Sequence, residues 1–123
     1  MAAEGFRGPR QLLGALTWSL KGLRAAWRHE ASFRLEVGLC VVVIPLGLWL
    51  GHGALEKIAL VAPALLLLAT ELVNSAIEAV VDLVSPEFHE LAGRAKDLGS
   101  AAVLLVVVLL VLSWALVLAP RWL

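Results

Sequence analysis

Five polar side chains recur on one face of an otherwise apolar segment near the middle of the chain. With Glu71 set at zero on a helical wheel, the other four fall within an arc of about 100°. They are Asn74, Ser75, Glu78 and Asp82, in the segment ELVNSAIEAVVDLV. Carboxylates held this close repel one another and need a cation. Mg²⁺ is the favoured cation because it takes carboxylate oxygens together with substrate phosphates.

The helix that carries these groups is expected to lie in a membrane. The chain has 123 residues, 61% of them hydrophobic, and a mean hydropathy of +0.91, which is more apolar surface than a soluble domain of this size can bury. Three apolar stretches run from 37 to about 55, from 58 through the acidic segment, and from 98 to 119. A span needs about 20 residues, and the second stretch reaches that length only by including Glu71 and Glu78. We therefore expect an all-α membrane protein with three transmembrane helices.

An amphipathic helix lying on the membrane surface is predicted for residues 10–34. Its apolar residues fall within an arc of about 80°, and a basic flank beside them suits anionic headgroups. The apolar set is Leu12, Leu16, Leu20, Leu23 and Trp27, and the basic set is Arg10, Lys21, Arg24 and Arg28. We divide the chain into residues 1–34, the tail and surface helix, and residues 35–123, a three-span unit that works with it. The start of the chain lacks the pattern of a signal peptide, so we expect no cleavage.

The basic residues also predict the orientation of the chain. Six of the ten precede the first span, and Arg94 and Lys96 lie in the second loop. The positive-inside rule places the N-terminus and the second loop in the cytoplasm and the C-terminus outside. In that loop, Ser85 as N-cap and Pro86 at the first position predict a short interfacial helix to about residue 91, broken near Gly93.

Carboxylates, cations and an amphipathic helix at one membrane boundary are the parts that phosphoryl transfer needs. The sequence contains no GxxxxGK[ST] or GxGxxG motif, so a nucleotide site must be built differently. Its three histidines lack zinc-like spacing. The formal net charge is zero, which gives no argument for nucleic acid.

Two long segments carry a resemblance to a known family. GLRAAWRHEASFRLE (22–36) and ELVNSAIEAVVDLVSPEFHELAGRAKDLGSAAV (71–103), with the three-span layout, closely resemble the bacterial diacylglycerol kinases, and the match extends over almost the whole chain from about residue 12. The resemblance implies a homotrimer in the bacterial inner (cytoplasmic) membrane. It also implies MgATP as phosphoryl donor, diacylglycerol as acceptor and phosphatidic acid as product.

The resemblance also assigns roles to single residues. It implies that Glu71 is the general base, supported by Asn74, and that Glu30 and Glu78 bind Mg²⁺. The implied nucleotide contacts, besides these metal ligands, are Trp18, Glu87, Phe88, His89, Lys96 and Asp97. The implied lipid contacts are Arg24, Ala25, Ala26, Trp27, Ser32, Phe33, Arg34, Leu35, Glu36, Glu71 and Ser100. Where many members have an early arginine that contacts the nucleotide, this chain has Gln11 beside Arg10, which leaves that contact open.

Three alternatives stay open at this point. The first is an undecaprenol kinase of the same family, which would share the fold and the metal–base set. The second is a small oligomeric ion or proton channel lined by Glu71, Glu78 and Asp82, although those acids gather in the cytoplasmic half rather than along the whole span. The third is a structural membrane subunit, in which substitution of Glu71 would have no effect on any activity.

Overall fold

The computed structural model describes residue 5 and residues 8–122, and everything it describes is helix, turn or loop. The four helices are α1 (Pro9–His29), α2 (Ala31–Leu50), α3 (Gly53–Val84) and α4 (Glu90–Trp122). Helices α2, α3 and α4 are each long and apolar enough to cross a membrane. The expected all-α architecture with three spanning helices is therefore confirmed.

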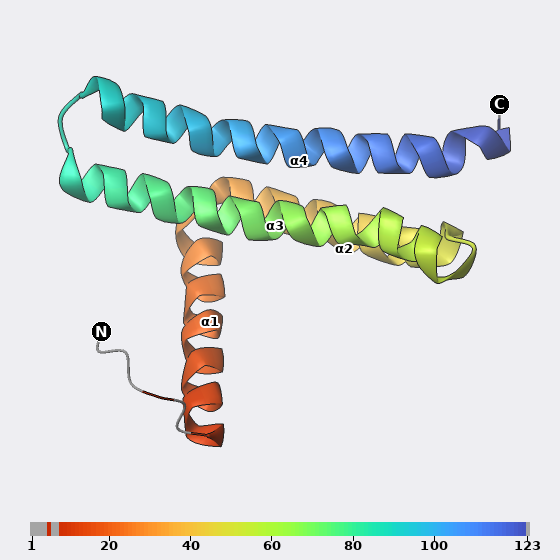
Figure 1. The fold of residues 1–123 in the computed structure, drawn as a ribbon, viewed down its shortest axis with the longest axis horizontal. Coiled ribbons are helices and arrows are strands. Elements are labelled where there is room, and N and C mark those ends of the chain that lie inside the picture. The colour runs from red at the N-terminus through yellow and green to blue at the C-terminus, as the bar shows by residue number, and fades with distance from the viewer. Residues whose placement is uncertain (1–4, 6–7, 123) are drawn as a thin grey trace.

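Helix α3 is the centre of the bundle (Figure 1). Helices α2 and α4 both pack along it, while α1 leaves the bundle at a steep angle. The α1–α2 junction lies in the same half of the bundle as the α3–α4 loop, and the α2–α3 turn lies at the opposite end with the C-terminus. The fold thus brings the surface helix and the second loop to one end of the three spans.

A single extended residue separates α1 from α2. The predicted surface helix was expected to run to residue 34, but it ends at His29, because Glu30 leaves the helical region at φ −118° and ψ 104°. The guanidinium of Arg34 stabilises this bend, since its Nη1 donates to the carbonyl oxygen of Trp27 at 2.7 Å. Such a bond satisfies one of the carbonyls that a helix end leaves without a partner.

The turn between α2 and α3 lies earlier in the chain than the sequence suggested. The first span ends at Leu50 rather than near residue 55, and α3 begins at Gly53, whose φ of +80° favours glycine. Arg121 near the end of α4 stabilises this end of the bundle, because it pairs with Glu56 and its Nη1 donates to the Leu50 carbonyl oxygen at 2.8 Å.

The prediction of a short helix from Pro86 to about residue 91 was wrong. Residues 85–89 form an irregular loop, and α4 begins at Glu90 and continues through Gly93 without a break. The reason is local hydrogen bonding: the Ser85 hydroxyl donates to the carbonyl oxygen of Glu87 at 2.9 Å instead of capping a helix. His89 takes the capping role, since its Nδ1 accepts the backbone N–H of Leu91 at 3.0 Å.

The buried core of a single chain is small. It centres on Cys40, Ala64, Leu67 and Leu110, and the indole N–H of Trp114 fastens α4 to α3 by donating to a backbone carbonyl at 3.0 Å. Most large apolar side chains of the three spans remain exposed. An exposed apolar surface of this extent suits lipid or further copies of the chain rather than water.

Candidate active site

Two polar residues of α3 are buried at the level where α2 passes alongside it. Glu71 is 5% exposed and Asn74 is 8% exposed, and they are the buried polar or charged residues of the described chain. A buried carboxylate is costly unless other groups compensate its charge. Groups around Glu71 must therefore compensate for its burial.

Carboxylates from three elements surround Glu71. The side chain of Glu36 on α2 lies close enough for a hydrogen bond between the two carboxyls when one of them holds a proton. Glu78, farther along α3, and Glu30, at the α1–α2 junction, also act on Glu71 electrostatically. The structure thus brings together the predicted base, both predicted metal ligands and one predicted lipid contact.

Asn74 connects this cluster to α4. Its Nδ2 donates to the Oε1 of Glu78 at 3.3 Å, which orients that carboxylate. Its Oδ1 faces the backbone of Gly99 so closely that a Cβ at position 99 would collide with it. Gly99 is itself buried, so the two helices approach each other here because one of them has no side chain.

Three buried polar atoms in this region have no hydrogen-bond partner among residues 5 and 8–122. They are the Oε2 of Glu36, the Oδ1 of Asn74 and the Oγ of Ser75. Buried polar atoms are satisfied in the great majority of native structures. Oxygen atoms of this kind are the ligands that a divalent cation or a substrate hydroxyl requires.

These groups offer few protein ligands to a metal ion such as Mg²⁺. Among residues 5 and 8–122, no three His, Cys, Asp or Glu side chains form a cage that could hold a metal ion alone. Mg²⁺ does not need such a cage, because it is commonly held by one or two carboxylates together with phosphate oxygens and water. Glu30 and Glu78 therefore fit a metal that arrives with a nucleotide.

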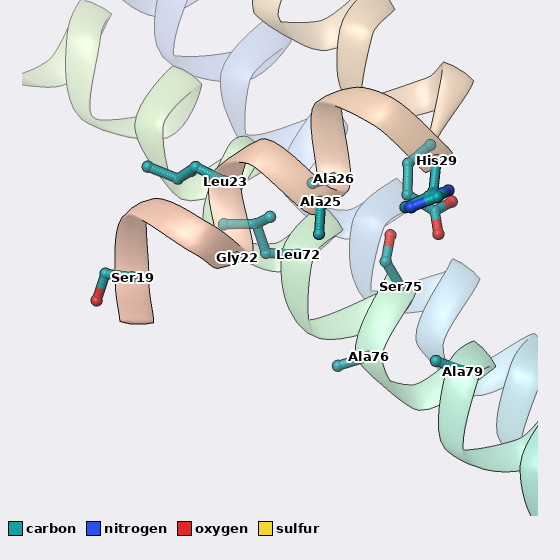
Figure 2. A pocket seen from close by; sticks show the side chains of 11 residues that line it. Ser19, Gly22, Leu23, Ala25, Ala26, His29, Leu72, Ser75, Ala76 and Ala79 are labelled. Atoms are coloured by element: carbon teal, nitrogen blue, oxygen red, sulfur yellow. The ribbon is translucent and has the colours of Figure 1, made fainter. Parts of the chain in front are cut away.

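A cleft of about 790 Å³ opens beside the cluster, between α1 and α3. Figure 2 shows small side chains along its walls and the Ser75 hydroxyl pointing toward the end where His29 lies. The residues that line it are Ser19, Gly22, Leu23, Ala25, Ala26, His29, Glu30, Leu72, Ser75, Ala76 and Ala79. Its mostly apolar walls suit the acyl chain of a lipid, and the Glu30 carboxylate among them suits a polar head.

A second, smaller cavity of about 180 Å³ lies at the α3–α4 loop. Four of the residues predicted to contact the nucleotide line it together: Glu87, Phe88, His89 and Lys96. Phe88 is 94% exposed, so its ring is available to a molecule arriving from the aqueous side. The fold thus gathers these four residues in one place, although they come from a loop and a helix.

The other two predicted nucleotide contacts lie apart from this cavity. Asp97 is exposed on α4 and does not line it. Trp18 is exposed on α1, and the backbone of that helix approaches α2 and α3 but not α4 within the described residues. Within one chain, Trp18 and the α3–α4 loop are not brought together.

The predicted lipid contacts are distributed over all four helices. Ala25 and Ala26 line the large cleft, and Phe33 is buried where α1 meets α2. Glu71 is buried on α3 and Glu36 is half-buried on α2. The remaining members are exposed, and they are Arg24, Trp27, Ser32, Arg34, Leu35 and Ser100. Only part of this set therefore faces the cleft in a single chain.

Sequence reasoning missed two features of the site. Ser19 and Gly22 line the cleft but were not predicted as site residues, although with Ala26 they recur at intervals of three and four on α1, a helical spacing of small residues. The close approach of Gly99 to Asn74 had no signal in the sequence, because it depends on how α4 packs on α3.

Three apolar helices with a buried carboxylate cluster toward one end define a membrane-embedded protein with a polar site at its boundary. Residues 17–118 match the family model described as prokaryotic diacylglycerol kinase. The chain is 42% identical over 116 residues to the diacylglycerol kinase of Escherichia coli K12. This alignment covers 94% of this chain and 95% of that protein. The chain is 44% identical over 115 residues to the diacylglycerol kinase of Pseudomonas aeruginosa, which covers 94% of each.

The chain therefore belongs to the prokaryotic diacylglycerol kinase family. The identification of the family from the segments 22–36 and 71–103 is confirmed, and so is the prediction that the chain is a kinase rather than a channel or a structural subunit.

Proposed function

We propose that the chain transfers the γ-phosphoryl group of ATP to diacylglycerol and yields phosphatidic acid at the cytoplasmic face of a bacterial inner membrane. The observation that carries the proposal is the burial of Glu71 among the carboxylates of Glu30, Glu36 and Glu78, next to a cleft bounded by α1. A carboxylate removed from water and within reach of a lipid hydroxyl is suited to take its proton.

Glu71 acts as the general base in this proposal. It accepts the proton of the acceptor hydroxyl, whose oxygen forms a bond to the γ-phosphorus while the bond from that phosphorus to the β,γ-bridging oxygen breaks. ADP leaves with the bridging oxygen. When bound, Mg²⁺ supplies charge neutralisation for the phosphate oxygens. Glu30 and Glu78 hold it, and Asn74 orients Glu78 through the bond at 3.3 Å.

The location of the site explains how two very different substrates meet. A lipid hydroxyl enters from the membrane along the apolar cleft between α1 and α3, and ATP enters from water at the α3–α4 loop. Glu71 and Glu78 lie on α3, the helix that lines both openings. Phosphoryl transfer needs mainly positioning and electrostatics, which a chain of this size supplies.

The orientation and the assembly are part of the proposal. The excess of basic residues before α2 and in the α3–α4 loop supports a cytoplasmic N-terminus and a periplasmic C-terminus. A homotrimer is supported by the extent of apolar surface that one chain leaves exposed. It is also supported by the position of Trp18, which meets the α3–α4 loop only if that loop comes from another copy.

The test is ATP-dependent labelling of lipid by the purified protein in detergent micelles, with and without Mg²⁺. We expect labelled phosphatidic acid from diacylglycerol, and loss of labelling when Mg²⁺ is chelated. Labelling of undecaprenol in preference to diacylglycerol would overturn the acceptor assignment. Conductance in liposomes without any phosphate transfer would overturn the proposal as a whole.

A further inference from the structure

Asp82 is the acidic member of the polar face of α3 to which the proposed function gives no role. It lies about one helical turn beyond Glu78, close to the end of α3, and its side chain is 65% exposed. Its Oδ1 nevertheless forms an ion pair with the Nζ of Lys96 at 2.6 Å. The pair crosses from α3 to α4, so it joins the acidic helix to the helix that begins at the nucleotide loop.

The ion pair lies at the cavity proposed for the nucleotide. Asp82 and Lys96 both line it, together with Glu87, Phe88 and His89 of the loop. Glu78 also acts on Lys96 electrostatically. The ammonium is therefore situated between the loop, where the nucleotide enters, and the carboxylate that would hold the metal.

The chemistry of lysine makes such a partner useful. Its ammonium carries three donors on a flexible four-carbon stem, so an unpaired lysine must lose considerable rotamer freedom when it binds a phosphate. Asp82 occupies one donor and leaves two for other acceptors. A lysine that is already held needs less ordering when the phosphates arrive.

We propose that Asp82 is a positioning residue that fixes the Lys96 ammonium on the path of the ATP phosphates. This inference rests on the proposed function, since it assigns a role within the same site. The alternative is that Asp82 and Lys96 form an ordinary surface ion pair. Such a pair would contribute little to stability and would not affect nucleotide binding.

A second ion pair supplies the matched control. Arg94 and Glu90, both on α4, form a pair at 3.8 Å whose side chains are 61% and 86% exposed. E90Q removes one carboxylate from the same end of the bundle, as D82N does, but it leaves Lys96 and its partner in place. Any general effect of reduced negative charge on nucleotide binding is common to both variants.

The experiment measures KM for MgATP and KM for diacylglycerol in micelles, with binding of MgATP to the resting protein by equilibrium dialysis. We expect D82N to raise KM and the dissociation constant for MgATP roughly two- to fivefold, the range of an exposed ion pair, and to leave KM for diacylglycerol unchanged. We expect E90Q to leave all three unchanged or to tighten MgATP slightly. D82E keeps the charge but displaces it, so an intermediate value is expected.

A double-variant cycle with K96M decides whether Asp82 acts through Lys96. If it does, D82N and D82E have no further effect on MgATP in the K96M background. An equal effect in both backgrounds, a lowered KM in D82N, or a D82N that matches E90Q would overturn the inference. If D82N fails to assemble, the same cycle is measured with D82E in its place. Wild-type protein that transfers no phosphate to lipid would instead overturn the proposed function, and this inference with it.

Discussion

Replacing Gly99 by alanine tests whether the approach of α4 to Asn74 matters for catalysis. A Cβ at position 99 would collide with the Oδ1 of Asn74 and would lie 3.3 Å from its Cγ and 3.8 Å from the Cδ1 of Ile77. Asn74 is 8% exposed, so its amide has little free space to enter. We expect G99A to displace the amide and to break its bond to Glu78.

The size of the effect follows from two opposing contributions. Alanine is a better helix former than glycine by about 0.5–1 kcal/mol, while overpacking of a tight site costs about 1–3 kcal/mol. G99A should therefore be destabilised by about 0–2.5 kcal/mol. A hydrogen bond to a charged group contributes about 1.5–3 kcal/mol, so phosphoryl transfer should fall by about tenfold to a hundredfold if Glu78 must be oriented in the transition state.

G38A on α2 provides the control. A Cβ at Gly38 would meet no atom within 4 Å, so this variant gains the helix propensity of alanine without a collision. The assay is the initial rate of transfer to diacylglycerol in micelles, together with thermal unfolding followed by circular dichroism. A G99A protein as active as G38A would refute the reasoning that Asn74 orients Glu78 through this contact.

Three further predictions use substitutions in the site and the bundle. E71Q should abolish transfer and leave assembly, measured by size-exclusion chromatography, unchanged; measurable turnover at the wild-type rate would remove Glu71 as base. E30Q and E78Q should each shift the Mg²⁺ titration of activity to higher concentration by about tenfold or more, and an unshifted curve in both would contradict the metal assignment. G47A should lower the unfolding temperature, because its Cβ would lie 3.0 Å from the Cβ of Leu60, whereas G38A meets no atom within 4 Å and should not.

The parts of the structure that could be predicted from the sequence are those that depend on local pattern. The apolar stretches predicted three spans, and the spacing of Glu71, Asn74 and Glu78 predicted a shared helical face, because both follow from hydrophobicity and the helical period. The clustering of these groups with Glu30 followed from the family resemblance rather than from spacing, since it requires α1 to meet α3.

The parts that could not be predicted depend on competing local bonds or on packing. Ser85 had the sequence context of an N-cap, yet the capping group is His89, because the serine hydroxyl is used by the carbonyl of Glu87. The end of α1 at His29 was missed because Glu30 interrupts a segment that is helical on both sides. The contact at Gly99 depends on tertiary packing alone.

The junction between α1 and α2 has a consequence for how the membrane acts on catalysis. One residue, Glu30, makes the whole bend, and it carries a carboxylate of the cluster around Glu71. A tilt of the surface helix therefore cannot occur without rotating that carboxylate, because no linker separates the two. Bilayer thickness, headgroup charge and anything else that changes the angle of α1 become variables that set the geometry of the proposed metal site.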